Sequence, residues 1–251
     1  TSPSFPNGLG NSSGQLGHNL MDHVVNEGTY GTYDGLKDKY YEGKSPGTIY
    51  VPRFQNLNKA SKNTDFIRGY GIQGKGEREN WQSIAKVGIG AALKEQLATP
   101  GNWKISLGGR GETLPNYENK ITLDAEKKDQ WGLPLVKVDF EYGPNELAMM
   151  KHMTEASEEL LSKAGFKNVG SYRTSPAPGS AVHEMGTARM GNDPKTSVVN
   201  QFQQLHDANN VFIVDAGPFV SQADKNPTWT ILALSWRTCD YIVEQLKMQN
   251  I

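Results

Sequence analysis

The spacing of apolar residues changes twice along this chain, and these changes limit the folds open to it. Up to residue 142, apolar residues stand in short runs between turn residues, as is typical of strands. The runs cover residues 47–52, 65–70, 103–107, 120–123 and 135–140. They predict a mostly antiparallel sheet, and the pattern from Trp81 to Ala98 predicts a helix between two of its strands.

A helical pattern follows Pro144-Asn145, and after the loop at residues 173–179 the chain changes again to glycine-rich turns, one buried strand and one long helix. Apolar residues keep helical spacing from Leu147 to Ala164, and Gly165 stands where a helix commonly ends, so we expect a helix covering one face of the sheet. A second long helix is expected to start at Asn226-Pro227, with Asn226 as its N-cap. The expected inward face of that helix carries Ile231, Ser235, Cys239, Ile242 and Leu246. A short helical stretch is expected at residues 14–23, and a loop at residues 173–179 is a candidate domain boundary.

Composition excludes several classes of function. The 251 residues include 26 basic and 27 acidic ones, so no net field favours nucleic acid or anionic membrane. No run of about 18 apolar residues is present, so no transmembrane segment is expected. The single cysteine, Cys239, excludes a disulfide framework within the chain and leaves cytoplasm and periplasm equally open. The start at Thr1 resembles neither a native start nor a signal peptide, so we expect a fragment.

Two motif matches fail on closer reading. Residues 69–74 fit G-x-G-x-x-G, but a glycine-interrupted polar turn follows where a dinucleotide fold requires a helix. A glycine-kinked strand is the better interpretation. His183-Glu184 begins like a zinc-protease helix, yet Thr187 occupies the place of the second histidine. The glycines at 186 and 191 instead predict a sharply turning backbone that approaches something closely.

Three places remain candidates for chemistry. His183 fits a structural imidazole and a functional one about equally. Asp215 ends an apolar run, residues 211–214, that predicts a buried parallel-type strand; it either caps the next turn or contacts a ligand at the sheet edge. The helix start at Pro227 suits a phosphate or a developing negative charge, although a plain capped helix explains Asn226 and Pro227 as well.

These segments together resemble the C-terminal part of the FAD-dependent glucose-methanol-choline (GMC) oxidoreductases. The resemblance rests on residues 17–23, 118–123, 132–134, 183–191, 193–200, 211–217 and 226–228, in the family's order. Within the family the chain looks nearest to bacterial glucoside 3-dehydrogenases and pyranose-oxidase-like enzymes. The strand–turn–helix with which members grip the FAD pyrophosphate and adenosine is absent from these 251 residues.

The resemblance implies an α+β fold: a mostly antiparallel substrate-domain sheet with helices, plus a strand and long helix from an α/β FAD-binding domain whose N-terminal half is missing. Residues 1–25 and 173–251 would belong to that FAD-binding domain, and residues 26–172 to the substrate-binding domain. The missing half would be a partner of this chain, which by itself would neither hold FAD nor be active.

The resemblance also assigns roles. His183 corresponds to the base that takes the hydroxyl proton while hydride leaves for the flavin, and Asn226 to the residue that hydrogen-bonds the alcohol oxygen. Asp215, Ala216, Pro227 and Thr228 correspond to flavin contacts, with the positive helix end facing the flavin. No metal is expected.

The implied reaction is oxidation of a CH–OH group of a sugar or polyol. Two alternatives stay open: a non-catalytic module that binds a sugar or a partner, and an enzyme of the same family that oxidises a non-sugar alcohol. Aromatic residues of the middle segment either stack on sugar rings or belong to the core. They are Tyr30, Tyr33, Tyr40, Tyr41, Trp81 and Trp103. The electron acceptor and the oligomeric state are not indicated.

Overall fold

The computed structural model describes residues 2–25, 28–38, 48–79, 88–98, 101–172 and 177–251, and these form two compact units. Unit 1 comprises Thr1–Val24, Glu112–Glu146 and Ala177–Ile251, and unit 2 comprises Val25–Gly111 and Leu147–Pro176. The outer limits of unit 2 lie within a few residues of the expected substrate-binding segment. Residues 112–146 of that expected segment lie in unit 1.

Unit 2 is built on an antiparallel sheet with the strand order β3-β4-β5-β2-β8, and β1 also pairs with β5. The strands are β1 (Val24–Val25), β2 (Thr29–Tyr33), β3 (Thr48–Val51), β4 (Tyr70–Arg78), β5 (Trp103–Gly111) and β8 (Lys167–Ser171). The α+β class and the antiparallel sheet predicted from the sequence are confirmed.

The glycine-rich run at residues 69–74 lies mostly in strand β4, as the strand interpretation predicted. A Cβ atom on Gly74 would overlap the carbonyl oxygen of Ser106 on the neighbouring strand β5. Only glycine therefore lets the two backbones approach so closely at this point.

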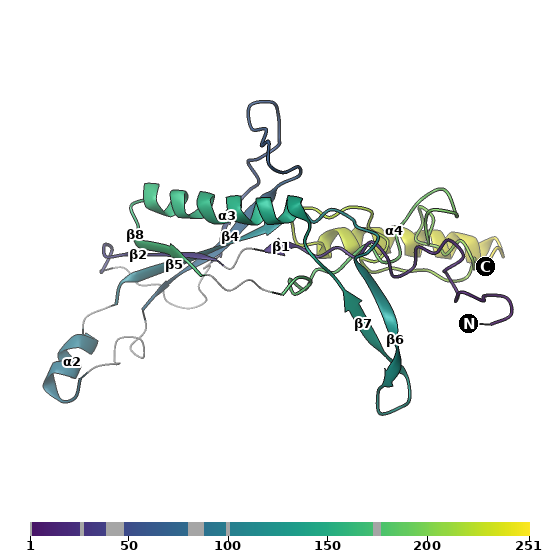
Figure 1. Cartoon of the computed structure of the whole chain (residues 1–251), viewed down its shortest axis with the longest axis horizontal. Helices are drawn as coiled ribbons and strands as arrows, with labels where there is room; N and C mark the ends of the chain where they lie inside the picture. Colours follow the sequence, from purple (N-terminus) through teal and green to yellow (C-terminus); the bar gives the residue numbers. More distant parts are fainter. Residues whose placement is uncertain (1, 26–27, 39–47, 80–87, 99–100, 173–176) are drawn as a thin grey trace. The chain divides into compact units, whose positions relative to one another are not determined.

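Helix α3 (Pro144–Lys163) runs along one face of this sheet, as Figure 1 shows. Its buried residues Met149, Met153 and Leu161 form the packing face. A Cβ on Gly109 of β5 would meet the Met153 side chain at 2.6 Å, so helix and strand are in direct contact. The helix predicted after residue 144 is confirmed, and Gly165 beyond its end has φ +83°.

Several local predictions in unit 2 were wrong or incomplete. Strands β2 and β8 were missed, because glycine and polar residues interrupt their alternation. Residues 65–69 form bends, and the strand begins only at Tyr70. Of the helix expected over 81–98, residues 80–87 lie outside the described part, and the remainder contains α2 (Ala91–Ala98), which has no buried residue.

Unit 1 contains one hairpin, one long helix and loops cross-linked by short bridges in its described residues. The hairpin joins β6 (Lys120–Lys128) to β7 (Pro134–Asp139), and the helix is α4 (Thr228–Lys247). Residues 14–23 are not helical as expected. They form turns and bends in which Gly14, Gly17 and Asn19 have positive φ, with isolated bridges at His18↔Lys120 and Met21↔Met185.

Two details of the C-terminal segment also differ from expectation. The run 211–214 is half-buried to exposed and forms only the isolated bridge Gln204↔Phe212, because the described residues place no strand beside it. On α4, Thr238 is buried and donates a hydrogen bond to Gln203 Oε1 at 2.7 Å. Of the predicted inward face, Ile231, Ser235 and Ile242 are half-buried, as expected, whereas Cys239 and Leu246 are exposed.

None of the helices in the described residues combines the length and hydrophobicity needed to cross a membrane.

Candidate active site

An antiparallel contact between two chain segments places His183 in unit 1. Met21 and Met185 exchange backbone hydrogen bonds of 2.8 and 2.9 Å, so His23 lies opposite His183. The two imidazole rings meet edge to face, with centroids 4.9 Å apart at 82°. His23 is fully buried, which gives the half-buried His183 ring a fixed wall on one side.

The backbone after His183 turns sharply and packs closely against another segment, as its glycines predicted. Gly186 has φ +97°, and a Cβ there would overlap the backbone oxygen of Asn19. The Gly186 and Ala188 N–H groups donate to the carbonyls of Ala216 and Gly217 at 3.3 and 2.9 Å. The loop therefore lies between the segment before His23 and the segment that carries Asp215.

Asn226 reaches His183. Helix α4 begins at Thr228, and its N-cap position is Pro227, which makes no side-chain cap bond. The prediction of Asn226 as N-cap was therefore wrong. Its Nδ2 lies 3.4 Å from Nε2 of His183, on the exposed side of the ring. Nδ1 of His183 is buried without a partner among the described residues, so Nε2 is the ring nitrogen that faces Asn226.

The four expected flavin-contact residues lie on two short segments of the same unit. Asp215 accepts the Gly217 N–H at 2.7 Å, so its carboxylate caps the turn, as the structural interpretation allowed. Ala216 is buried with Met21 and Met185, and Ile231 of α4 packs against that cluster. This cluster ties the start of α4, with Pro227 and Thr228, to the His183 loop.

The start of α4 has the donor chemistry that an electron-rich group requires. The first N–H groups of a helix have no intrahelical acceptor, and here no side chain at the N-cap replaces one. The positive end of the helix dipole lies at the same place. A flavin edge or another negatively polarised group therefore fits beside Asn226.

Asp22 makes a contribution to this site that was not predicted from the sequence. Its fully buried carboxylate accepts backbone N–H groups from His23 at 2.8 Å, Ala181 at 2.6 Å and His183 at 3.1 Å. The residue stands in the segment 17–23 that carried the family resemblance, yet no local pattern indicates an acceptor for residues 160 positions away.

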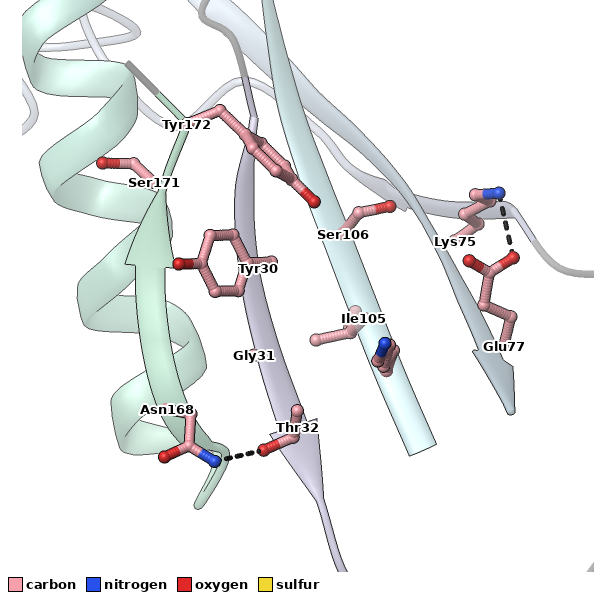
Figure 2. Close-up of a pocket in the computed structure, with 11 residues that line it drawn as sticks. Tyr30, Gly31, Thr32, Lys75, Glu77, Ile105, Ser106, Asn168, Ser171 and Tyr172 are labelled. Atoms are coloured by element: carbon pink, nitrogen blue, oxygen red, sulfur yellow. Dashed lines mark hydrogen bonds and ion pairs between the residues drawn. The ribbon is translucent and has the colours of Figure 1, made fainter. Parts of the chain in front are cut away.

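Unit 2 contains a separate candidate site, a pocket of about 350 Å³ on the sheet. The strand register places Tyr30, Lys75 and Ser106 side by side on one face. On the other face, Met153 of α3 lies against Gly109, and Leu161 of α3 and Phe166 lie against Gly31. Figure 2 shows the Tyr30 and Tyr172 rings on this face of the sheet, with the helix behind β8.

Aromatic rings and polar groups share this pocket. The Tyr30 and Tyr172 rings lie 5.0 Å apart, and Lys75 pairs with Glu77 at 2.9 Å. Asn168 donates to the Thr32 hydroxyl at 3.0 Å (Figure 2). Such a mixture of ring faces and hydrogen-bonding groups suits a ligand that is itself polar with apolar faces.

The other aromatic candidates have structural contacts or cannot be placed. Tyr33 packs against Phe166, with ring centroids 5.8 Å apart. The Arg78 guanidinium lies 4.8 Å from the Trp103 ring centroid. Tyr40, Tyr41 and Trp81 lie outside the described residues. Within the part of the chain that the structure describes, no cluster of His, Cys, Asp and Glu has the arrangement of a metal site.

Comparison with known proteins identifies relatives of this chain. Residues 115–235 match the family model described as GMC oxidoreductase. The chain is 31% identical to 2-methyl-1,2-propanediol dehydrogenase of Mycolicibacterium austroafricanum over 94% of its own length and 43% of that protein. It is 25% identical to the fructose dehydrogenase large subunit of Gluconobacter japonicus, covering 96% of this chain and 43% of that protein. The chain thus spans less than half the length of these relatives.

Solved structures agree at the level of the fold. Formate oxidase of Aspergillus oryzae superimposes with a TM-score of 0.57 at 14% sequence identity, over 95% of this chain and 48% of that one.

Proposed function

We propose that this chain, whose residues 115–235 match the GMC oxidoreductase family model, supplies the base and the substrate-orienting amide for oxidation of a CH–OH group in a flavin enzyme. The supporting observation is the 3.4 Å contact between His183 Nε2 and Asn226 Nδ2. The two side chains come from segments 43 residues apart, so the contact is a product of the fold.

The direction of this contact defines the chemistry. With Asn226 Nδ2 as donor, His183 Nε2 is the acceptor and carries no proton. An alcohol placed between them donates its hydroxyl proton to Nε2 and accepts a hydrogen bond from the amide. As the proton moves to His183, the amide stabilises the negative charge that develops on the oxygen, and being neutral it does not compete for the proton.

FAD, when bound, provides the acceptor for the hydride that leaves the same carbon. In this chain, the uncapped start of α4 at Thr228 would face the electron-rich edge of the flavin, with Pro227, Asp215 and Ala216 beside it. One helix end contributes about 0.3–2 kcal/mol. Micromolar binding requires about 8 kcal/mol. We therefore assign the main FAD anchors to residues outside these 251.

A sugar or polyol is the proposed substrate class. Two of the relatives are named for fructose and for a branched propanediol, which are both polyhydroxylated. The Tyr30–Tyr172 pocket offers ring faces beside lysine, glutamate and serine groups, and such a surface suits hydroxyl-rich rings. A non-sugar alcohol would use the same base and amide, so the substrate alternatives differ only in unit 2.

The test is the rate of flavin reduction in the flavin-loaded enzyme that contains this chain. His183→Ala should slow reduction by roughly a hundredfold or more, because it removes the general base. His18→Ala is the matched control. That imidazole stacks on Tyr117 at 3.8 Å, in the same unit, and should leave the rate within about twofold of wild type.

Two outcomes would count against the proposal. Equal reduction rates in wild type and His183→Ala would remove His183 from the chemistry. A protein without flavin absorbance, or with flavin that no sugar, polyol or simple alcohol reduces, would favour the non-catalytic binding module.

A further inference from the structure

One buried carboxylate fixes the backbone on both sides of the residue that precedes His183. Asp22 Oδ2 accepts the Ala181 N–H at 2.6 Å, and Asp22 Oδ1 accepts the His183 N–H at 3.1 Å. The same Oδ1 accepts the His23 N–H at 2.8 Å, and the Thr113 hydroxyl donates to the Asp22 carbonyl. A buried carboxylate needs hydrogen-bond donors, because it has no contact with water. Two of its three backbone donors, Ala181 and His183, belong to the loop that carries His183.

The residue between the two clamped N–H groups has an unfavourable backbone. Val182 has φ +59°, and it is the only β-branched residue with a positive φ in the described part of the chain. Its side chain is 77% exposed, so packing does not hold it there. A β-branched residue in this region is strained, and it persists only where the surroundings impose it. The two hydrogen bonds to the Asp22 carboxylate hold the N–H groups on either side of this residue.

We propose that Asp22 is a positioning residue for His183. By holding Ala181 and His183 through one carboxylate, it keeps Val182 left-handed and directs the imidazole between the buried His23 ring and the Asn226 amide. Without the clamp, Val182 returns to a negative φ and the His183 side chain changes direction. This inference rests on the proposed function, in which His183 is the base.

A second buried carboxylate in unit 1 provides a matched control. Glu146 is 4% exposed and accepts the Leu114 N–H and the Gly143 N–H, both at 3.0 Å. It holds the chain where α3 begins, and neither of its backbone partners adjoins His183. Glu146→Gln and Asp22→Asn therefore make the same chemical change, a buried carboxylate to an amide, at two loops of one unit.

The experiment compares these two variants in the flavin-loaded enzyme. Both should lower the thermal unfolding temperature, because each leaves an amide NH2 facing a backbone N–H. Only Asp22→Asn should also lower the limiting rate of flavin reduction per bound flavin, by tenfold or more, since a misplaced catalytic group costs up to about a hundredfold. The alcohol concentration for half-maximal rate should change less than the rate itself. Equal rates in the two variants would overturn the proposal.

His183→Ala in the same assay separates this proposal from the one on which it rests. If His183→Ala is slow and Asp22→Asn reduces flavin at the wild-type rate, only the positioning role fails. If His183→Ala is as fast as wild type, the proposed function itself fails.

A second pair of variants serves if Asp22→Asn does not fold. Val182→Gly removes the cost of the left-handed conformation, so the double variant Asp22→Asn/Val182→Gly is easier to fold. It should reduce flavin at least tenfold more slowly than Val182→Gly alone. Without the Asp22 carboxylate, a glycine at position 182 no longer holds the backbone in the conformation that positions His183. Equal rates in these two proteins would also overturn the proposal.

Discussion

The two units hold their backbones in place by different means. In unit 2 the polar backbone groups pair with one another across an antiparallel sheet, and the pocket side chains lie on top of that ladder. In unit 1 the loops around His183 are held by single side chains such as Asp22 and by isolated bridges. The sheet of unit 2 is stabilised by many equivalent backbone hydrogen bonds, whereas the His183 loop depends on the hydrogen bonds of one residue, Asp22.

This difference indicates where each unit tolerates change. The open face of the sheet can vary its side chains without altering the strand register, which suits a surface that selects among substrates. The His183 loop lacks the repeated hydrogen bonds of a helix or sheet. Substitutions where its backbone packs closely against other segments should therefore change both the free energy of unfolding and the proposed reaction rate.

The largest effect is expected at Gly186 in unit 1. Gly186→Ala would place a Cβ against the Asn19 backbone oxygen at φ +97°, where neither side can yield easily. We expect a loss of about 3 kcal/mol or more in the free energy of unfolding, since left-handed strain alone costs about 1–3 kcal/mol. Denaturant unfolding of the purified protein measures it.

Gly14→Ala is the control for this prediction. Gly14 also has a positive φ, +68°, but a Cβ there meets nothing within 4 Å. Gly14→Ala should therefore lower the free energy of unfolding only by the cost of the left-handed backbone conformation, about 1 kcal/mol. If the two variants are equally stable, the close approach of the His183 loop to residue 19 is not a constraint on this fold.

The limits of sequence-based prediction follow the same contrast. Strands 103–111 and 134–139 and helix 144–163 could be predicted because their patterns are local and regular. Strand β2 was missed because Gly31 interrupts its pattern, and its identity depends on the neighbours β5 and β8. Even a correct list of strands would not give the pocket, which requires knowing which strand pairs with which.

The site in unit 1 shows a different limit. Asn226 fits the local sequence pattern of a helix cap, and only the family resemblance placed its amide near His183; in the structure the two side chains, 43 residues apart in sequence, lie 3.4 Å from each other. Asp22 forms its hydrogen bonds with residues about 160 positions further on. The family resemblance pointed to both segments as parts of the site. The spacing of residues along the chain, however, does not predict the contacts that Asn226 and Asp22 make.

A smaller effect, dependent on pH, is expected from the core of unit 2. Burial raises the pKa of the Tyr70 hydroxyl well above its usual value near 10, and the hydroxyl lies 2.7 Å from Nδ1 of His152. The contribution of Tyr70 to stability is complete below pH 10. Above it, the unfolded chain releases a proton that the folded chain keeps, so stability falls by at most about 1.4 kcal/mol per pH unit.

Urea unfolding of wild type and Tyr70→Phe between pH 8 and about 11.5 isolates this contribution. The variant loses the hydrogen bond to His152 at every pH, at a cost of about 1 kcal/mol. The difference between the two proteins should therefore shrink as pH rises above 10, because only wild type has a phenol to ionise. A difference that stays constant across this range would show that the phenol ionises equally readily in the folded and unfolded chain.

The smallest effect is expected at the exposed ion pair of the sheet pocket. The Lys75 and Glu77 side chains are 62% and 51% exposed, and exposed pairs contribute about 0–1 kcal/mol. Lys75→Ala should change the free energy of unfolding by less than about 0.5 kcal/mol, as should Lys151→Ala, which removes an exposed pair on α3 outside the pocket.

Substrate binding should then separate these two lysine variants. If the pocket contacts a sugar or polyol, Lys75→Ala removes a hydrogen-bond donor and should raise the KM of the flavin enzyme about threefold to tenfold, with kcat nearly unchanged. Lys151→Ala should leave both constants as they are. An unchanged KM for Lys75→Ala would exclude this lysine from substrate recognition, and a large loss of stability would show that the open face of the sheet is as sensitive to single side chains as the His183 loop.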